Sequence, residues 1–267
     1  MPNIFLNGVN LYYEIHGEGA PLMLIAGLAS DSQSWQPILN DLSRSYRVII
    51  FDNRGAGRTK PQSVETSIQH IADDCMALVN FLGLPSVALL GHSMGGFVAL
   101  DCAIRYPEYV SSLILAATSA CNSERNNALF LDWVYYLESG MELEYWFRNV
   151  FYWLFSERFF KDKEALNDAV LLAIEYPYPQ SISAFKKQVN ALTECNFLER
   201  LPDVKSKTLV ICGKEDLMFP PEESRTLFNA IPGSIFSVIE HAAHALSLEN
   251  PRAFTHGILN FLDTLQS

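Results

Sequence analysis

The sequence has few basic residues for its length, few cysteines and no long apolar run. Its 19 lysines and arginines are outnumbered by 30 acidic residues, which leaves a formal net charge of −11. Because phosphate binding needs a basic face, this balance argues against a nucleic-acid partner. The apolar stretches at residues 87–90 and 110–117 are too short to span a bilayer, so no membrane insertion is expected. The N-terminal residues also lack the basic and apolar regions of a secretory signal.

The cysteine pattern gives little support for a disulfide framework, a metal site or a redox motif. The number is odd, the spacing is irregular and no CxxC pair occurs among Cys75, Cys102, Cys121, Cys195 and Cys212. A reducing compartment is the simplest interpretation, so we expect a cytoplasmic protein. Hydrophobic residues make up 49% of the chain and charged residues 18%, which is typical of a folded protein with a sizeable core.

Short apolar runs alternate with helical patterns along most of the chain. The segments 4–6 and 9–13, separated by the turn-forming pair Asn7-Gly8, predict an opening hairpin. Runs without polar alternation are typical of parallel strands that are covered on both faces, and the order therefore predicts an α/β fold with a mostly parallel, doubly wound sheet. The further strands are predicted at 22–25, 48–51, 87–90, 113–116, 209–212 and 235–239, with helical spacing at 68–82 and 97–106.

One segment interrupts this alternation. Residues 119–202 contain no strand-like run and are helical in pattern and rich in aromatic residues. We expect them to form a helical cap, or lid, over one edge of a core domain made of residues 1–118 and 203–267. Most of the aromatic side chains are expected to form the core of the cap itself. The candidates to face a substrate are Trp133, Trp146, Phe147 and Trp153.

The sharpest motif is GHSMGG at residues 91–96, which fits G-x-S-x-G between a predicted strand and a predicted helix. A serine on such a tight turn has strained backbone angles, so the residues two positions before and after it must lack side chains. Gly91 and Gly95 meet that requirement, and Gly96 allows the helix to pack closely. The turn would expose the Ser93 hydroxyl at the carboxyl end of the sheet, which indicates a nucleophile.

A serine nucleophile needs a base, and the base needs a carboxylate to orient it. Two histidines, His241 and His244, follow the last strand, and we favour His244 because it lies further into the loop; an HxxH metal site is the weaker interpretation of this pair. His92 is expected to be a packing residue. After the strand at 209–212 come Glu215 and Asp216, of which Asp216 is preferred because it directly precedes an apolar turn.

Acyl transfer also requires donors for a tetrahedral oxyanion. One is expected to be the backbone N–H of Met94, the residue after the nucleophile. The other is expected from the loop that follows the strand at 22–25, with the N–H of Leu28 as the choice.

At these motifs the chain resembles the α/β-hydrolase superfamily, which also has the order nucleophile, acid, histidine. The resemblance rests on GHSMGG at 91–96, FDNRGAGRT at 51–59, GKEDLMFP at 213–220 and HAAHALSLENP at 241–251. It implies a structural role for the 52–59 loop, including Arg54. Two positions depart from the family pattern, since Ala26 replaces a histidine before the oxyanion donor and Ala243 replaces a glycine. The chain looks most similar to 3-oxoadipate enol-lactonases, small carboxylesterases and pimeloyl-ACP methyl ester esterases, while cofactor-free haloperoxidase-like esterases share the triad.

Together these residues predict a serine hydrolase that cleaves a small ester or lactone with an apolar part through an acyl-enzyme. No metal or organic cofactor is expected, and the protein would act as a monomer or homodimer. Two alternatives stay open: a slow or non-catalytic small-molecule sensor, and, within the hydrolases, an enol-lactonase or an acyl-carrier methyl ester esterase. A substrate carboxylate would need a cation, for which Arg125, Arg148 and Arg158 are the cap candidates; the alternative is that all three are solvated surface charges.

Overall fold

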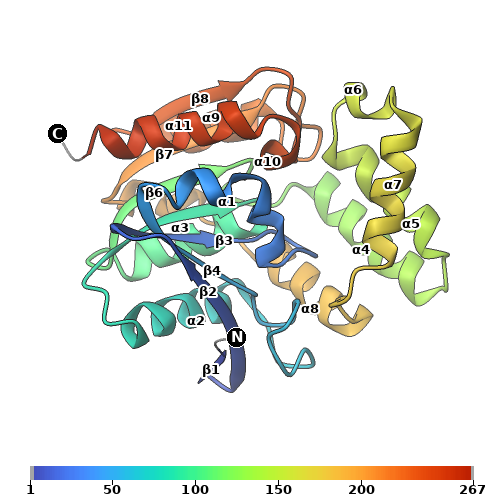
Figure 1. Ribbon diagram of the computed structural model, residues 1–267, viewed down its shortest axis with the longest axis horizontal. Helices are drawn as coiled ribbons and strands as arrows, with labels where there is room; N and C mark the ends of the chain where they lie inside the picture. Colours follow the sequence, from blue (N-terminus) through green and yellow to red (C-terminus); the bar gives the residue numbers. More distant parts are fainter. Residues whose placement is uncertain (1–2, 266–267) are drawn as a thin grey trace.

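The computed structural model describes residues 3–265, which fold around an eight-stranded sheet (Figure 1). The strand order is β1-β2-β4-β3-β5-β6-β7-β8, and all neighbours from β4 to β8 are parallel, whereas β2 pairs antiparallel with both β1 and β4. The strands are β1 (Asn3–Leu6), β2 (Val9–His16), β3 (Ala20–Ile25), β4 (Tyr46–Phe51), β5 (Val87–His92), β6 (Val110–Ala116), β7 (Lys207–Gly213) and β8 (Ile235–Ile239). This confirms the predicted fold class.

Helices cover both faces of the sheet. On one face, α2 (Ile68–Phe81), α3 (Met94–Arg105) and α9 (Pro221–Ala230) share a buried cluster with residues such as Met23 and Ile25 of β3. On the other, α1 (Gln36–Leu42), α10 (Leu246–Glu249) and α11 (Pro251–Asp263) pack with Leu22 and Leu24. Successive side chains of a strand point to opposite faces, so a strand covered on both sides is apolar throughout.

A block of helices is inserted between β6 and β7. It consists of α4 (Glu124–Glu138), α5 (Leu143–Leu154), α6 (Glu157–Phe160), α7 (Lys163–Ile174) and α8 (Ile182–Thr193). Figure 1 shows α4 to α7 gathered beside the sheet, in green to yellow. An isolated bridge between Cys121 and Asn196 joins the two ends of this insertion. We call α4 to α8 the inserted helices.

The predicted elements are confirmed, with shifts at their ends. The helix expected at 97–106 begins at Met94, directly after Ser93, because two glycines with poor helix propensity hide its first turn in the sequence. The strand expected at 113–116 begins at Val110, since Ser111 and Ser112 interrupt its apolar pattern. Within residues 3–265, no helix combines the length and the apolar character needed to cross a membrane.

Candidate active site

Ser93 lies on a sharp turn between β5 and α3. Its backbone φ is 55° and its ψ is −122°, a combination that residues with a β-carbon rarely adopt. Its N–H donates to the Ala116 carbonyl (3.0 Å), and its own carbonyl accepts from the Gly96 N–H (2.8 Å) and from Thr118 Oγ1 (2.8 Å). These three hydrogen bonds hold the strained conformation in place.

The glycines of this turn leave no room for side chains. A β-carbon on Gly91 would collide with the Gly95 carbonyl, and one on Gly95 would collide with the Ile25 carbonyl at the end of β3. At Gly96 a β-carbon would lie 2.5 Å from the Thr118 side chain. The structure therefore confirms the steric reason for the glycine pattern.

The buried Asp216 carboxylate holds the His244 ring. Its Oδ2 lies 2.9 Å from His244 Nδ1, while its Oδ1 accepts the backbone N–H groups of Met218 (2.8 Å) and Phe219 (2.9 Å). Because an ionised carboxylate only accepts hydrogen bonds, Nδ1 carries the proton and Nε2 is left as an acceptor. Asp216 follows β7 and His244 follows β8, so two adjacent parallel strands bring these residues together.

The neighbouring candidates lie at the surface. His241 is exposed and has a backbone φ of 58°, and Glu215 is exposed beside the buried Asp216. Of the two acidic candidates and the two histidine candidates, Asp216 and His244 are the ones whose side chains are in contact.

His92 has a contact that the sequence did not indicate. Its Nε2 donates to the His244 carbonyl (2.9 Å), and the two rings lie 4.9 Å apart between centroids. Burial, together with the nearby His244, lowers the pKa of His92 to about 3. His92 is thus a neutral donor at neutral pH as well as the packing residue that was expected.

The loop after β3 passes directly beside Ser93. A β-carbon on Gly27 would lie 3.1 Å from Cβ of Ser93, and Leu28 lines the same cavity as that serine. Met94 is the first residue of α3, a position whose N–H has no acceptor within its own helix. Both residues expected to supply oxyanion donors therefore lie in segments next to Ser93. The Asn53 amide donates to the Ala26 carbonyl (3.0 Å), so the 52–59 loop supports this backbone.

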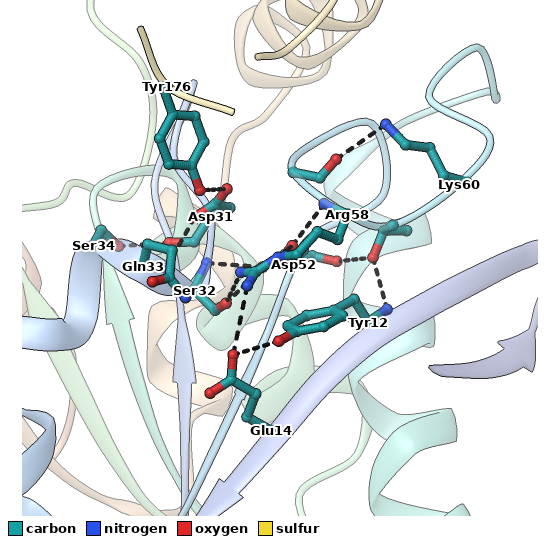
Figure 2. A network of polar contacts seen from close by, with 12 residues as sticks. Tyr12, Glu14, Asp31, Ser32, Gln33, Ser34, Asp52, Arg58, Lys60 and Tyr176 are labelled. Carbon is teal, nitrogen blue, oxygen red and sulfur yellow. Dashed lines mark hydrogen bonds and ion pairs between the residues drawn. The ribbon is translucent and has the colours of Figure 1, made fainter. Parts of the chain in front are cut away.

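A polar network connects the 52–59 loop to two other segments of the chain (Figure 2). Asp52 accepts from both the N–H and the Oγ of Ser32 and from Arg58 Nε (2.8 Å). Asp31 caps the short 3₁₀ helix η1 (Ser32–Trp35) and accepts the hydroxyl of Tyr176, which lies between α7 and α8. Burial and the nearby Asp52 raise the pKa of Asp31. The sequence did not indicate the link to Tyr176, because no local motif spans that separation.

Glu249 joins the His244 loop to the inserted helices. Its Oε2 accepts the Ala243 N–H (2.7 Å), and its Oε1 accepts the N–H (2.9 Å) and the Oγ (2.6 Å) of Ser156. The Ala245 N–H donates to the Leu154 carbonyl (3.0 Å) close by. Sequence reasoning gave Glu249 no role, although its fixed spacing after His244 was part of the family resemblance.

A cavity of about 410 Å³ lies between the strand ends and the inserted helices, and both Ser93 and His244 line it. Trp133, Trp146 and Phe147 are also lining residues, as the sequence suggested. Trp153 is not, and its ring instead lies 5.8 Å from the guanidinium carbon of Arg125. Lining residues that the sequence did not single out include Phe130, Val150, Phe151, Leu154, Phe155 and Phe185.

Comparisons with known proteins show which proteins this chain resembles. The model described as "alpha/beta hydrolase fold" matches residues 20–251. A protein from Azorhizobium caulinodans named as a candidate carbamate hydrolase, RutD, is 27% identical and is covered over 98% of both chains. A thermophilic esterase from Thermogutta terrifontis has a TM-score of 0.87 and 26% identity, covering 99% of this chain and 97% of the other. The enol-lactonase from Burkholderia xenovorans LB400 has a TM-score of 0.88 at 23% identity, covering 98% and 100%, and shows likeness of fold alone.

Proposed function

The chain belongs to the alpha/beta-hydrolase family, and on that premise we propose that it is a serine hydrolase that cleaves a carboxylic ester or lactone. The family and the names of its relatives support a hydrolytic enzyme in general. The proposal of an ester bond rests on the residues in the cavity. In this proposal Ser93 is the nucleophile, His244 the general base and Asp216 the group that orients it.

The reaction would proceed in two halves. Nε2 of His244 takes the Ser93 proton as the hydroxyl oxygen attacks the substrate carbonyl, and the same proton then passes to the departing alkoxide. Water next attacks the acyl-enzyme, again with His244 as base, and the acid is released as Ser93 regains its proton. In a lactone the alcohol and the acid stay joined in one product.

Backbone donors would stabilise the tetrahedral oxyanion. We assign this role to the N–H groups of Leu28 and Met94, and each such donor lowers the barrier by about 3–4 kcal/mol in comparable sites. Met94 also begins α3, whose positive N-terminal end favours negative charge. The inserted helices, within residues 119–202, would act as a cap that shields the reaction from bulk water.

One observation carries the proposal: Ser93, on a strained turn, and His244, held by the buried Asp216, line the same cavity. The carboxylate has both oxygens occupied by donors, so it holds the ring in the tautomer that a serine base requires. A purely structural role would require neither the strain at Ser93 nor this orientation of the ring.

A fluorophosphonate probe and a short p-nitrophenyl ester test the proposal. We expect the probe to label Ser93, identified by peptide mass spectrometry, and the Ser93→Ala variant to lose both labelling and turnover. Ser247→Ala is the matched control, because Ser247 lines the same cavity without belonging to the proposed machinery. Labelling of the protein at a residue other than Ser93 would refute the assignment. Hydrolysis of the ester by Ser93→Ala at the wild-type rate would also refute it.

The same experiment separates the enzyme from a sensor. A sensor on this fold would be labelled at Ser93 yet show no turnover across a panel of esters, lactones and carbamates. Multiple turnovers on any member of that panel support the enzyme.

A further inference from the structure

The walls of the cavity restrict the kind of substrate that can occupy it. We propose, on the basis of the function proposed above, that the site takes uncharged substrates with an apolar acyl or alcohol group and excludes analogues that carry a free carboxylate. Among the described residues that line the cavity there is no aspartate, glutamate, lysine or arginine.

The arginines that could have neutralised a substrate carboxylate are engaged or located elsewhere. Arg125 donates to the Leu217 carbonyl (2.8 Å), and Arg148 pairs with Glu144 (3.0 Å) and Asn167 (2.7 Å). Arg158 is exposed on α6. None of the three lines the cavity, so none of these cap candidates is placed to pair with a carboxylate bound there.

The indole N–H groups that the inserted helices contribute to the lining are also occupied. Nε1 of Trp133 donates to Asn149 Oδ1 (2.7 Å), and Nε1 of Trp146 donates to the Trp133 carbonyl (3.1 Å). These indoles therefore present hydrocarbon surface to a ligand. His92 also lines the cavity but is neutral and uses its Nε2 hydrogen on the His244 carbonyl.

The mouth of the cavity is apolar as well. Leu172 of α7 and Leu248 of α10 line the cavity although 70% and 58% of their surfaces are exposed. Ala169 and Ala173, on the same side of α7 as Leu172, continue this wall inward. A substrate group that reaches from Ser93 to the rim therefore meets apolar side chains along the way.

A carboxylate in this space would lose hydration without gaining a cationic partner. Transfer of an unpaired ion into an apolar site is strongly unfavourable, whereas each buried methylene of a neutral chain is favourable. A volume of about 410 Å³ lies within the usual range for sites that hold small molecules. Neutral and acidic esters of equal length should therefore be distinguished sharply.

A matched pair of esters tests this inference. p-Nitrophenyl hexanoate and the mono-p-nitrophenyl ester of adipic acid have acyl chains of equal length, with a carboxylate in place of the terminal methyl in the second. After subtraction of the uncatalysed rates, we expect kcat/KM to favour the neutral ester by at least about 100-fold, equivalent to about 2.7 kcal/mol. Equal kcat/KM values for the pair would overturn the inference. Turnover of neither ester, without labelling of Ser93, would count against the proposed function instead.

Two further measurements identify the cause of the discrimination. The net charge of −11 could repel acidic esters at long range, but added salt screens that repulsion. A preference that persists at high ionic strength supports the cavity as its origin, and one that disappears contradicts it. Leu172→Arg places a cation at the rim and should raise relative kcat/KM for the acidic ester at least about tenfold, whereas Leu172→Gln, similar in size but uncharged, should not. An unchanged ratio in Leu172→Arg would contradict the missing countercharge as the cause.

Discussion

Nε2 of His92 donates a 2.9 Å hydrogen bond to the backbone carbonyl of His244. The residue before the candidate nucleophile thereby fixes the main chain that carries the candidate base. A neutral imidazole with its proton on Nε2 makes this contact without burying charge, whereas a protonated ring would place a cation beside a second imidazole. The geometry of the site is therefore linked to the protonation state of one largely enclosed histidine.

This link predicts a pH-dependent stability. The pKa of His92 is lowered from its ordinary 6.5 to about 3 on folding. Between these two pH values the unfolded chain binds a proton at His92 and the folded chain does not. The contribution of His92 to stability is therefore present above about pH 6.5 and is lost as the pH falls. The free energy of unfolding should change by at most about 1.4 kcal/mol per pH unit from this group. His92→Gln retains an N–H donor and should flatten the dependence of the free energy of unfolding in urea. His256→Gln, on the exposed face of α11, serves as the control, and equal slopes in all three proteins would contradict the prediction.

Asp216→Asn should lower kcat/KM by about 10³–10⁴-fold with little change in fold. Its side-chain oxygen must still accept from Met218 and Phe219, so the amide NH₂ would face His244 Nδ1. That contact turns Nδ1 into an acceptor and places the proton on Nε2, the wrong tautomer for a base. Glu215→Gln, one residue away and exposed, should keep full activity in the same steady-state assay. The reverse ranking of the two variants would assign the acid to Glu215.

Gly27→Ala should reduce turnover more than stability. The added β-carbon would lie 3.1 Å from Ser93 Cβ and 3.4 Å from the His92 carbonyl, so either the loop or the serine must shift. A displacement of the reacting groups by about 1 Å can lower the rate about 100-fold. Gly233→Ala should have the opposite effect and lower stability while leaving kcat unchanged. The φ of Gly233 is 67°, which disfavours a side chain, but no other atom lies close to where the β-carbon would be. Parallel assays and thermal unfolding compare them, and full activity in Gly27→Ala would show that the loop has room to move.

Tyr176→Phe should lower the free energy of unfolding by up to about 1.5 kcal/mol, since it removes a hydrogen bond to the Asp31 carboxylate. We also expect KM to rise, because Asp31 caps the turn whose Ser34 and Trp35 line the cavity. Tyr178→Phe, in the same segment, preserves the ring near Arg58 (5.2 Å) and should change neither quantity. Similar losses of stability in both variants would contradict the prediction, because they would not be specific to the hydrogen bond between Tyr176 and Asp31.

Asp31→Asn should leave the protein equally or more stable at neutral pH. The pKa of Asp31 is raised by burial and by Asp52, so its contribution to stability is present below the unfolded value of about 3.8 and is lost as the pH rises through the folded value. The amide removes that dependence while Gln33 and Tyr176 retain partners. Urea unfolding of both proteins between about pH 4 and pH 8 measures the difference. If Asp31→Asn instead lowered the free energy of unfolding, and did so most at high pH, the prediction would be wrong.

Much of the site could be predicted because its signals are local or follow from strand ends. The turn at Ser93 needs glycines at fixed spacing, and the structure shows backbone carbonyls where their side chains would be. Asp216 and His244 each follow an apolar run, and parallel strands end at one edge of the sheet. In contrast, the aromatic residues of the insertion are so numerous that composition could not separate Phe151, which lines the cavity, from Trp153, which does not.

The sequence by itself determined the α/β architecture, the helical insertion and the strained serine turn, because apolar periodicity and steric demands act over a few residues. Tertiary structure decided which side chains meet: His92 with the His244 backbone, Tyr176 with Asp31, Glu249 with Ser156, and no charged side chain at the cavity wall within residues 3–265. These contacts join segments that are far apart in the chain. Their partners are selected by how helices pack on the sheet, which no local pattern encodes.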